Sequence, residues 1–251
     1  TPIYEKYVGD FVKRFGAEKT MEMYNYTDTY GSLVYENIQA RIRGHLLSTF
    51  ASIEGGVIIN NANKIEVALG YCTLYGDAIG AVAPLGDLTK VQCFQVARDL
   101  NTYFGKEVIS NTLIPEVIGD EIKWDMPPSA ELKEAQLDPM KWFYHDEIIR
   151  QYTENPYNIE NIMEQYLDKT IYDSYLGKWI KYYGLDDPKK FIEDIEWVLN
   201  KIELGVFKRV QSCPIISISK SCFGNDFREN QTKYEKSHKY LELKEAILNE
   251  N

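Results

Sequence analysis

Two charged side chains lie where helices are predicted to begin, and both suit the binding of phosphate and magnesium. Glu66 is in the first turn of a predicted short helix over residues 63–69, just beyond the β-branched run at 57–59. Ligands of α/β proteins bind beyond the carboxyl ends of strands, and a carboxylate there suits Mg2+, which prefers hard oxygen ligands. Lys90 is in the first turn of another predicted helix, where an ammonium and backbone N–H groups together favour an anion.

Four polar residues add donors and acceptors to this set. Asn37 and Arg41 lie four apart on one face of a predicted helix, about 100° from its apolar stripe. Arginine can hold a phosphate or a carboxylate through two parallel hydrogen bonds. Asn61 precedes the helix of Glu66, and Ser129 follows two prolines in a predicted loop.

Each candidate also has a purely structural alternative. The helix dipole alone favours a glutamate in the first turn, as at Glu66, and an isolated lysine such as Lys90 is normally solvated surface. Asparagine and serine are common helix caps, which would account for Asn61 and Ser129. Residue type therefore leaves both interpretations open for each of these positions.

Three sequence segments carry a stronger signal than any single residue. Residues 63–90 read NKIEVALGYCTLYGDAIGAVAPLGDLTK, residues 36–43 read ENIQARIR, and residues 127–132 read PPSAEL. In this order they resemble the NAD+ synthetases, which amidate deamido-NAD+ at the expense of ATP. The likeness is closest to the synthetase half of the glutamine-dependent, two-domain enzymes, and it runs from about residue 35 to residue 152.

The resemblance implies a fold and a chemistry. The fold is α/β, a Rossmann-like parallel sheet of the ATP-pyrophosphatase (adenine nucleotide α-hydrolase-like) type, here truncated and mostly helical. In the reaction, the nicotinate carboxylate attacks the α-phosphate of ATP to give an adenylate, and ammonia then displaces AMP. The implied ligands are ATP, Mg2+ and deamido-NAD+. The implied partners are a glutaminase domain outside this chain, as the ammonia source, and further copies in a homodimer or larger homo-oligomer.

The resemblance also assigns roles to individual positions. The ATP-binding positions are Asn61, Lys90 and Ser129. The deamido-NAD-binding positions are Asn37, Arg41, Glu66 and Lys208, of which Glu66 also faces the metal. In the family, the positions of Asn37 and Arg41 serve a substrate site across a dimer interface. Ala40 and Gly44 are small enough to permit close helix approach there.

The sequence departs from the family pattern in ways that leave two hypotheses. The Ser-Gly-Gly-x-Asp-Ser loop that grips the ATP pyrophosphate is absent, and Asn225 replaces an arginine of a late family element. In the first hypothesis the chain is the C-terminal part of such an enzyme, with the glutaminase and the pyrophosphate loop encoded upstream of Thr1. In the second it is a non-catalytic scaffold or oligomerisation fragment. Under either hypothesis, we expect this chain alone to be inactive.

Bulk composition excludes several classes of protein. The formal charge of −10 argues against a nucleic-acid surface, and no apolar run approaches the roughly 20 residues of a membrane helix. The four cysteines form no Cys-x-x-Cys pair and the three histidines are widely separated. We therefore expect a reduced, cytoplasmic protein with no zinc site and no membrane contact.

Periodicity predicts the surrounding elements. A long helix from Ser32 to about residue 53 should bury an apolar stripe, residues 57–59 should form a fully buried parallel strand, and residues 81–83 another strand. A short helix from Tyr4 to Phe15 and a loop over 17–31 are expected before the long helix. Asp87 is expected to cap the helix over 88–103, and residues 106–143 to be irregular. Asp187-Pro188 is a predicted helix start, followed by an amphipathic stripe that Gly205 ends: Phe191, Ile192, Ile195, Val198, Leu199 and Ile202. We place a boundary near 155, so that residues 1–155 form the synthetase-like part and residues 156–251 a helical extension.

Overall fold

The computed structural model describes residues 6, 9–10, 13–14, 29–119, 121–125, 139–229 and 234–250, with side chains described from residue 36 onward in the first long helix. Ser129 and most of the helix predicted from Tyr4 to Phe15 lie outside the described residues. So do residues 17–28 of the loop predicted over 17–31; its residues 29–31 are helical instead. The described part is mainly helical. Its helices are α3 (Thr29–Glu54), α4 (Lys64–Leu69), α5 (Lys90–Phe104), α6 (Tyr144–Glu154), α7 (Asn158–Leu167), α8 (Tyr175–Tyr182), α9 (Pro188–Leu204), α10 (Val206–Arg209) and α11 (His238–Leu248).

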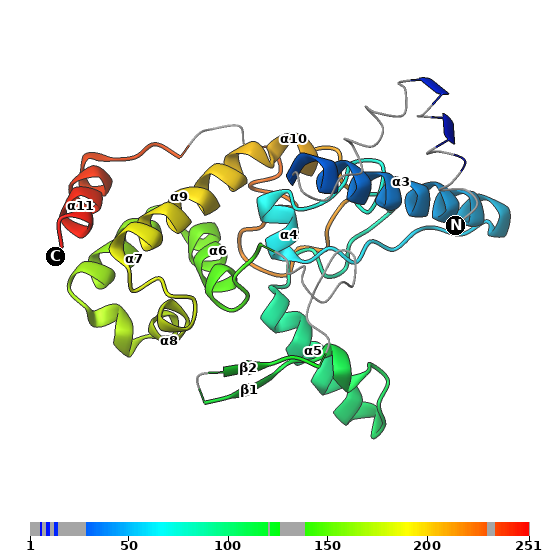
Figure 1. Ribbon diagram of the computed structural model, residues 1–251. Coiled ribbons are helices and arrows are strands. Elements are labelled where there is room, and N and C mark those ends of the chain that lie inside the picture. Colours follow the sequence, from blue (N-terminus) through cyan, green and yellow to red (C-terminus); the bar gives the residue numbers. More distant parts are fainter. Residues whose placement is uncertain are drawn as a thin grey trace.

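The hydrophobic core lies among the helices of the C-terminal half. Helices α6 to α9 and α11 gather on one side of the molecule (Figure 1). Aromatic rings fill much of the space between them: Tyr166 stacks on Phe191 with centroids 3.8 Å apart, and Phe143 stacks on Trp179 at 4.5 Å. Such rings bury large apolar areas, so this half supplies most of the hydrophobic stabilisation of the described residues.

Helix α9 shows most clearly how the sequence forms its element. Asp187 accepts hydrogen bonds from the N–H groups of Lys189 and Lys190, and Pro188 begins the helix at a position where its missing N–H is harmless. The helix ends before Gly205, as predicted. Its apolar side chains recur at helical spacing, and the predicted stripe is buried throughout: Phe191, Ile192, Ile195, Val198, Leu199 and Ile202.

Helix α4 joins the remainder of the chain to this core. Ile65, Ala68 and Leu69 belong to the same buried cluster as the side chains of α6 and α9. This cluster contains residues from both sides of position 155, so the two parts of the chain pack on one another. The predicted division at residue 155 stays a prediction. The consequence for the site is direct: the helix that carries Glu66 rests on a rigid, well-packed support.

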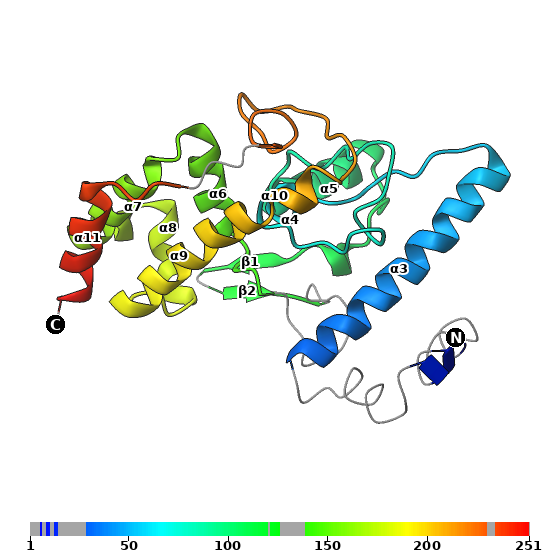
Figure 2. The same cartoon turned by 90° about the horizontal axis from the view of Figure 1, so that it is seen from above.

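Helix α3 is confirmed as a long helix, but it begins at Thr29 and its predicted stripe is only partly buried. Ile38 is buried, whereas Phe50 and Ile53 are 60% and 70% exposed. The reason is visible in Figure 2, where the C-terminal end of α3 extends beyond the rest of the described chain. There the helix has no neighbouring element among the described residues to cover its apolar side.

The small residues of α3 are used within the chain, which corrects their predicted role. A Cβ on Gly44 would come within 2.7 Å of the Gly76 carbonyl oxygen, and a Cβ on Gly76 would come within 2.9 Å of the Ala40 carbonyl carbon. The turn around Gly76 therefore packs directly on α3. Ala40 and Gly44 allow this turn to approach, and they are not available to a second copy of the helix.

Three extended segments pair in parallel beside α4. Ile59 bridges Val82, and Ala83 bridges Ile215, each in parallel orientation. The pairing at 81–83 agrees with the predicted strand there. The prediction of a fully buried strand at 57–59 is wrong, because Val57 and Ile59 are 69% and 50% exposed. No described element lies against their outer side.

The segment after α5 contains a feature that the sequence did not predict. β1 (Glu116–Ile118) and β2 (Glu121–Lys123) form an antiparallel hairpin within the stretch expected to be irregular, with Val117 opposite Ile122. The start of α5 was also predicted wrongly. Thr89, whose side chain accepts from the Gln92 N–H, caps this helix, and Asp87 is buried in an ion pair instead.

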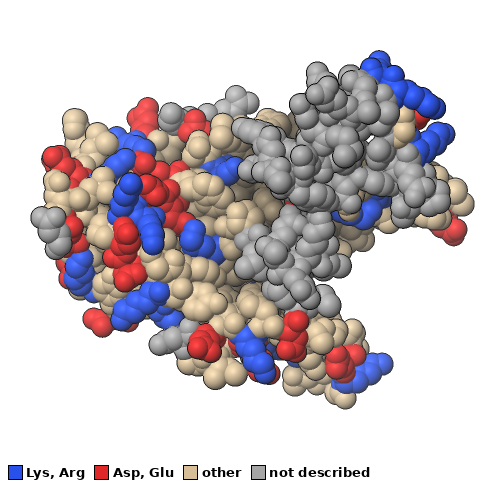
Figure 3. All heavy atoms as spheres, in the orientation of Figure 1, with Lys and Arg blue, Asp and Glu red and all other residues tan. Residues whose placement is uncertain are grey.

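Surface charge agrees with the acidic composition. Lysine and arginine side chains alternate with aspartate and glutamate over the helical half on the face shown in Figure 3. None of the described helices combines the length and the apolarity needed to cross a membrane.

Candidate functional site

Glu66 is fixed by the local sequence around it. The Asn63 side chain accepts hydrogen bonds from the N–H groups of Ile65 and Glu66, and Glu66 Oε2 accepts from the Asn63 N–H at 2.9 Å. This reciprocal capping box satisfies N–H groups that the helix itself leaves without partners. Glu66 is partly buried and has a structural role in this capping box, while its ligand role stays a prediction.

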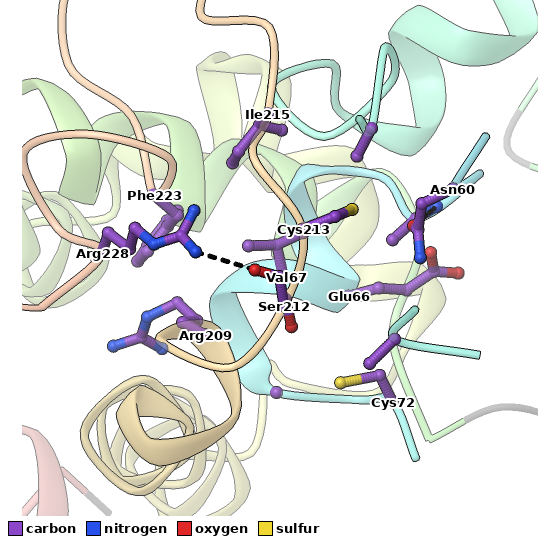
Figure 4. A pocket seen from close by; sticks show the side chains of 14 residues that line it. Asn60, Glu66, Val67, Cys72, Arg209, Ser212, Cys213, Ile215, Phe223 and Arg228 are labelled. Atoms are coloured by element: carbon purple, nitrogen blue, oxygen red, sulfur yellow. Dashed lines mark hydrogen bonds between the residues drawn. The ribbon is translucent and has the colours of Figure 1, made fainter. Parts of the chain in front are cut away.

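A small cavity of about 30 Å³ lies beside Glu66, and we call it the Glu66 cavity. Its lining comes from three regions of the chain, which include Asn60, Glu66, Cys72, Arg209, Cys213 and Phe223. In Figure 4, Glu66 and Asn60 lie on one side of the cavity, while Arg209 and Arg228 lie on the other. Arg228 donates to the Ser212 carbonyl at 2.7 Å, which holds the C-terminal loop against the cavity.

A second hollow, of about 160 Å³, adjoins the first at Cys72 and is more polar. We call it the polar groove; its lining includes Glu36, Asn37, Gln39, Arg43, Tyr71, Asp77 and Lys208. The structure therefore brings together Asn37 and Lys208, two predicted substrate residues that are far apart in the sequence. Thr73 donates to Asn37 Oδ1 at 2.6 Å, which orients the amide.

Lys208 has a structural role as well as a place in the groove. Its ammonium donates to the carbonyl oxygens of Gly70 at 2.8 Å and Cys72 at 2.7 Å. The neighbouring Arg209 donates to the Ala68 carbonyl at 2.7 Å. Together these two residues bind the carbonyl groups at the end of α4. An ammonium has three donors, so these two bonds leave Lys208 one donor for a ligand in the groove.

Two half-buried thiols, Cys72 and Cys93, lie near the charged groups of the site. Burial raises the pKa of Cys72 to about 11, with Lys208 opposing the rise and Asp77 and Glu66 adding to it. Burial likewise raises the pKa of Cys93 to about 11, with Lys90 opposing. Glu66 and Asp146 both add to the rise at Cys93. Glu66 therefore lies within electrostatic range of both thiols, one beside Lys208 and the other beside Lys90. Neither thiol is a nucleophile at neutral pH.

The environment of Lys90 corrects part of the argument for an anion site at the start of α5. The Lys90 and Val91 N–H groups donate to the two oxygens of Asp146 at 3.2 and 2.8 Å. A buried carboxylate thus occupies the helix N-terminus that was expected to receive phosphate. The Lys90 ammonium lies over the rings of Phe94 and Trp142, at 5.7 and 5.3 Å from their centroids. Only this ammonium remains as a candidate phosphate contact.

The remaining predicted residues are more peripheral in the described structure. Arg41 is exposed and donates through Nε to the Leu74 carbonyl at 3.2 Å. Asn61 is exposed next to the buried Asn60. Ser129 lies outside the described residues. No group of three or more His, Cys, Asp or Glu within the described ranges is arranged to hold a metal. A metal at Glu66 would therefore need oxygens from a bound phosphate and from water.

Three residues that shape the site were missed. Asn60 donates to the carbonyls of Asp77 and Ile79 at 2.7 and 2.8 Å, and so fixes the turn between the two hollows. Asp146 occupies the start of α5, and Thr73 orients Asn37. Thr73 lies inside the family-like segment and could have been found there. Asn60 and Asp146 act through contacts with residues at least 17 positions away in the sequence, and no local pattern predicts such contacts.

Comparisons with known proteins identify the family to which this chain is similar. A family model described as NAD synthase matches residues 8–181. A glutamine-dependent NAD(+) synthetase of Xanthomonas campestris pv. campestris is 32% identical over 205 residues, which are 81% of this chain and 31% of the relative. One from Thermotoga maritima is 31% identical over 196 residues, 77% of this chain and 28% of the relative. The chain thus spans less than a third of the length of these relatives.

One solved structure was also compared, that of glutamine-dependent NAD+ synthetase from Acinetobacter baumannii in complex with adenosine diphosphate. It is 22% identical, with a TM-score of 0.38, over 93% of this chain and 35% of that chain.

Proposed function

Because the chain belongs to the NAD synthase family, we propose that it serves NAD+ biosynthesis by supplying part of the site where deamido-NAD+ is amidated. The nicotinate carboxylate would attack the α-phosphate of ATP, and ammonia would then displace AMP. The observation that carries this proposal is the convergence of Asn37, Glu66 and Lys208 on the two adjoining hollows that share Cys72.

The polar groove is suited to the substrate end of the reaction. Lys208 and Arg43 supply positive charge there, beside the carboxyl groups of Glu36 and Asp77, and Asn37 and Gln39 supply amides. A carboxylate bound among these groups would gain charge-assisted hydrogen bonds. We therefore assign the nicotinate end of deamido-NAD+ to the polar groove, with Asn37 and Lys208 as contacts. Arg41 lies on the adjacent surface of α3.

The Glu66 side of the site is suited to the nucleotide. Mg2+ takes oxygen ligands and commonly binds one or two carboxylates together with substrate phosphates and water. Glu66 supplies one carboxylate, and Lys90 supplies an ammonium on the adjoining helix start, which the Lys64 N–H joins to that of Glu66 through the Leu88 carbonyl. We assign ATP to this side, with Asn61, Lys90 and Ser129 as its proposed contacts. The parallel pairing of 58–60, 81–83 and 214–216 supports a Rossmann-like sheet of the ATP-pyrophosphatase type.

Several properties of the active enzyme extend beyond these 251 residues. Charge neutralisation around the phosphates carries most of the catalysis in phosphoryl chemistry. The Ser-Gly-Gly-x-Asp-Ser loop that would supply it is absent from the sequence. We propose that the chain alone makes no NAD+, that a glutaminase domain supplies ammonia, and that the enzyme is a cytoplasmic homo-oligomer. The absent loop equally favours the second candidate, a non-catalytic scaffold.

A binding measurement tests the substrate assignment. Titration of deamido-NAD+ into the 251-residue chain should show saturable binding, and Lys208→Met should weaken it at least tenfold. Lys220→Met, which removes an exposed lysine from the loop that follows α10, is the matched control and should bind like the unaltered chain. Equal affinity in both variants would refute the assignment of the polar groove. An assay of NAD+ formation with ATP-Mg2+ and ammonia separates the catalytic hypothesis from the scaffold hypothesis once the missing loop is supplied.

A further inference from the structure

A buried ion pair lies directly behind the proposed nucleotide side of the site. Lys64 Nζ is 2.9 Å from Asp87 Oδ1, and the side chains of the two residues are 4% and 0% exposed. Neither residue lines the Glu66 cavity or the polar groove. Burying two opposite charges is unfavourable unless their remaining hydrogen-bonding groups are also satisfied. The surroundings of this pair meet that condition.

The hydrogen bonds to Asp87 come from the C-terminal loop. The N–H groups of Ile218 and Ser219 donate to Asp87 Oδ2 at 2.8 and 2.7 Å, and Ser219 Oγ lies 2.8 Å from the same oxygen. Lys64 Nζ also donates to Ser219 Oγ at 3.3 Å. Burial disfavours the charged carboxylate, but the Ser219 N–H and the Lys64 ammonium outweigh it and lower the pKa of Asp87. Asp87 therefore stays charged at neutral pH.

The pair joins the two helix starts that carry the proposed nucleotide contacts. Lys64 is two residues before Glu66, and Asp87 is three residues before Lys90. A backbone hydrogen bond of 2.7 Å from the Lys64 N–H to the Leu88 carbonyl reinforces the same junction. The loop held by Asp87 continues to Phe223 and Arg228, which line the Glu66 cavity. One carboxylate thus fixes three segments of the site.

We propose that Lys64 and Asp87 are positioning residues, which set the spacing between Glu66 and Lys90 and hold the 217–219 loop against the Glu66 cavity. This inference rests on the proposed function, since it assumes that Glu66 and Lys90 bind one nucleotide. The two residues act through the backbone and touch no ligand. A well-packed apolar pair would often be at least as stable as a buried ion pair, so stability alone does not account for the charges.

The test compares Asp87→Asn with a variant that is destabilised elsewhere. Asp87→Asn removes the charge but keeps the size of the side chain. Ile180→Ala creates a cavity in α8, where Ile180 is fully buried, far along the chain from both helix starts. ATP-Mg2+ and deamido-NAD+ are each titrated into the chain and its variants, with the amide NMR signals of Glu66, Lys90 and Ser219 as probes.

We expect Asp87→Asn to weaken ATP-Mg2+ at least tenfold, to shift the Ser219 amide signal, and to leave deamido-NAD+ affinity within threefold. Ile180→Ala should lower the melting temperature and change the affinities for ATP-Mg2+ and deamido-NAD+ by similar factors. Equal ATP-Mg2+ affinity of Asp87→Asn and the unaltered chain would overturn the positioning role. If the unaltered chain shows no ATP-dependent shift at Glu66 or Lys90, the nucleotide assignment fails as well, and this outcome is distinguishable from the first.

Discussion

The carboxylate at the start of α5 makes a specific prediction about pH and stability. Asp146 is 3% exposed, and it accepts hydrogen bonds from the Lys90 and Val91 N–H groups. Burial raises its pKa from 3.8 to about 6, although these hydrogen bonds and the Lys90 charge oppose the rise. The folded chain therefore retains a proton on Asp146 at pH values where the unfolded chain has lost it.

The sign of the effect follows from this difference in proton affinity. A carboxyl whose pKa is higher in the folded chain contributes stability at low pH, and this contribution is lost as the pH rises from about 4 through about 6. The interval from 3.8 to about 6 corresponds to about 3 kcal/mol of unfolding free energy, at about 1.4 kcal/mol per pH unit. Between pH 4.5 and pH 7.5 the measurable part is about 2 kcal/mol.

Asp146→Asn removes this titration. The amide keeps one acceptor for the two N–H groups, so the variant should lose about 1 kcal/mol at every pH for the weakened hydrogen bonding. In addition to this constant loss, the unfolding free energy of the unaltered chain should decrease by about 2 kcal/mol relative to that of Asp146→Asn between pH 4.5 and pH 7.5.

Urea denaturation at several pH values measures this difference in unfolding free energy. Asp99→Asn, which changes an exposed carboxylate on α5, is the control and should follow the unaltered chain. A pH-independent difference between Asp146→Asn and the unaltered chain would show that the Asp146 carboxylate is not destabilised by burial.

Two further changes test other parts of the account. Asp194 pairs with Lys141 and lies 3.0 Å from His145 Nε2, so Asp194→Asn should lower the unfolding free energy by about 3–5 kcal/mol. Burial opposes the charge of Asp194, but its bonds to His145 and Lys141 prevail and lower its pKa, while burial lowers the pKa of His145. Both shifts make the unaltered chain lose stability as the pH falls. Urea denaturation at pH 7 measures the loss in Asp194→Asn, and an unfolding free energy equal to that of the unaltered chain would contradict the role of this pair. Gly76→Ala should push the 73–78 turn away from α3, because its Cβ would lie 2.9 Å from the Ala40 carbonyl carbon; we expect deamido-NAD+ affinity to fall, and unchanged affinity would contradict the close packing.

Local patterns predicted the elements that are stabilised locally. The periodic stripe and the Asp187-Pro188 start defined α9, and the Asn63–Glu66 spacing defined the start of α4. The family resemblance assigned Asn37 and Lys208 to one substrate site, although 170 residues separate them in the sequence and no periodicity relates them; both line the polar groove.

Long-range contacts account for what sequence reasoning missed. Asp87 is an ordinary helix-cap residue by type, but Lys64 and the 217–219 loop draw it into a buried ion pair, and Thr89 becomes the cap. Asp146 reaches the α5 N-terminus from 55 residues away. The exposure of 57–59 depends on which elements cover that segment. Tertiary packing determines the ion pair of Asp87, the contact of Asp146 with α5 and the exposure of residues 57–59. No local sequence pattern predicts that packing.

A crystal structure of the chain soaked with deamido-NAD+ tests the central claim most directly. We predict that the nicotinate carboxylate lies in the polar groove within hydrogen-bonding distance of Lys208 Nζ, with the Asn37 amide in contact with the ligand. Density for deamido-NAD+ elsewhere on the chain, with the groove between α3 and the 70–77 segment empty, would contradict the claim that these residues form the substrate site.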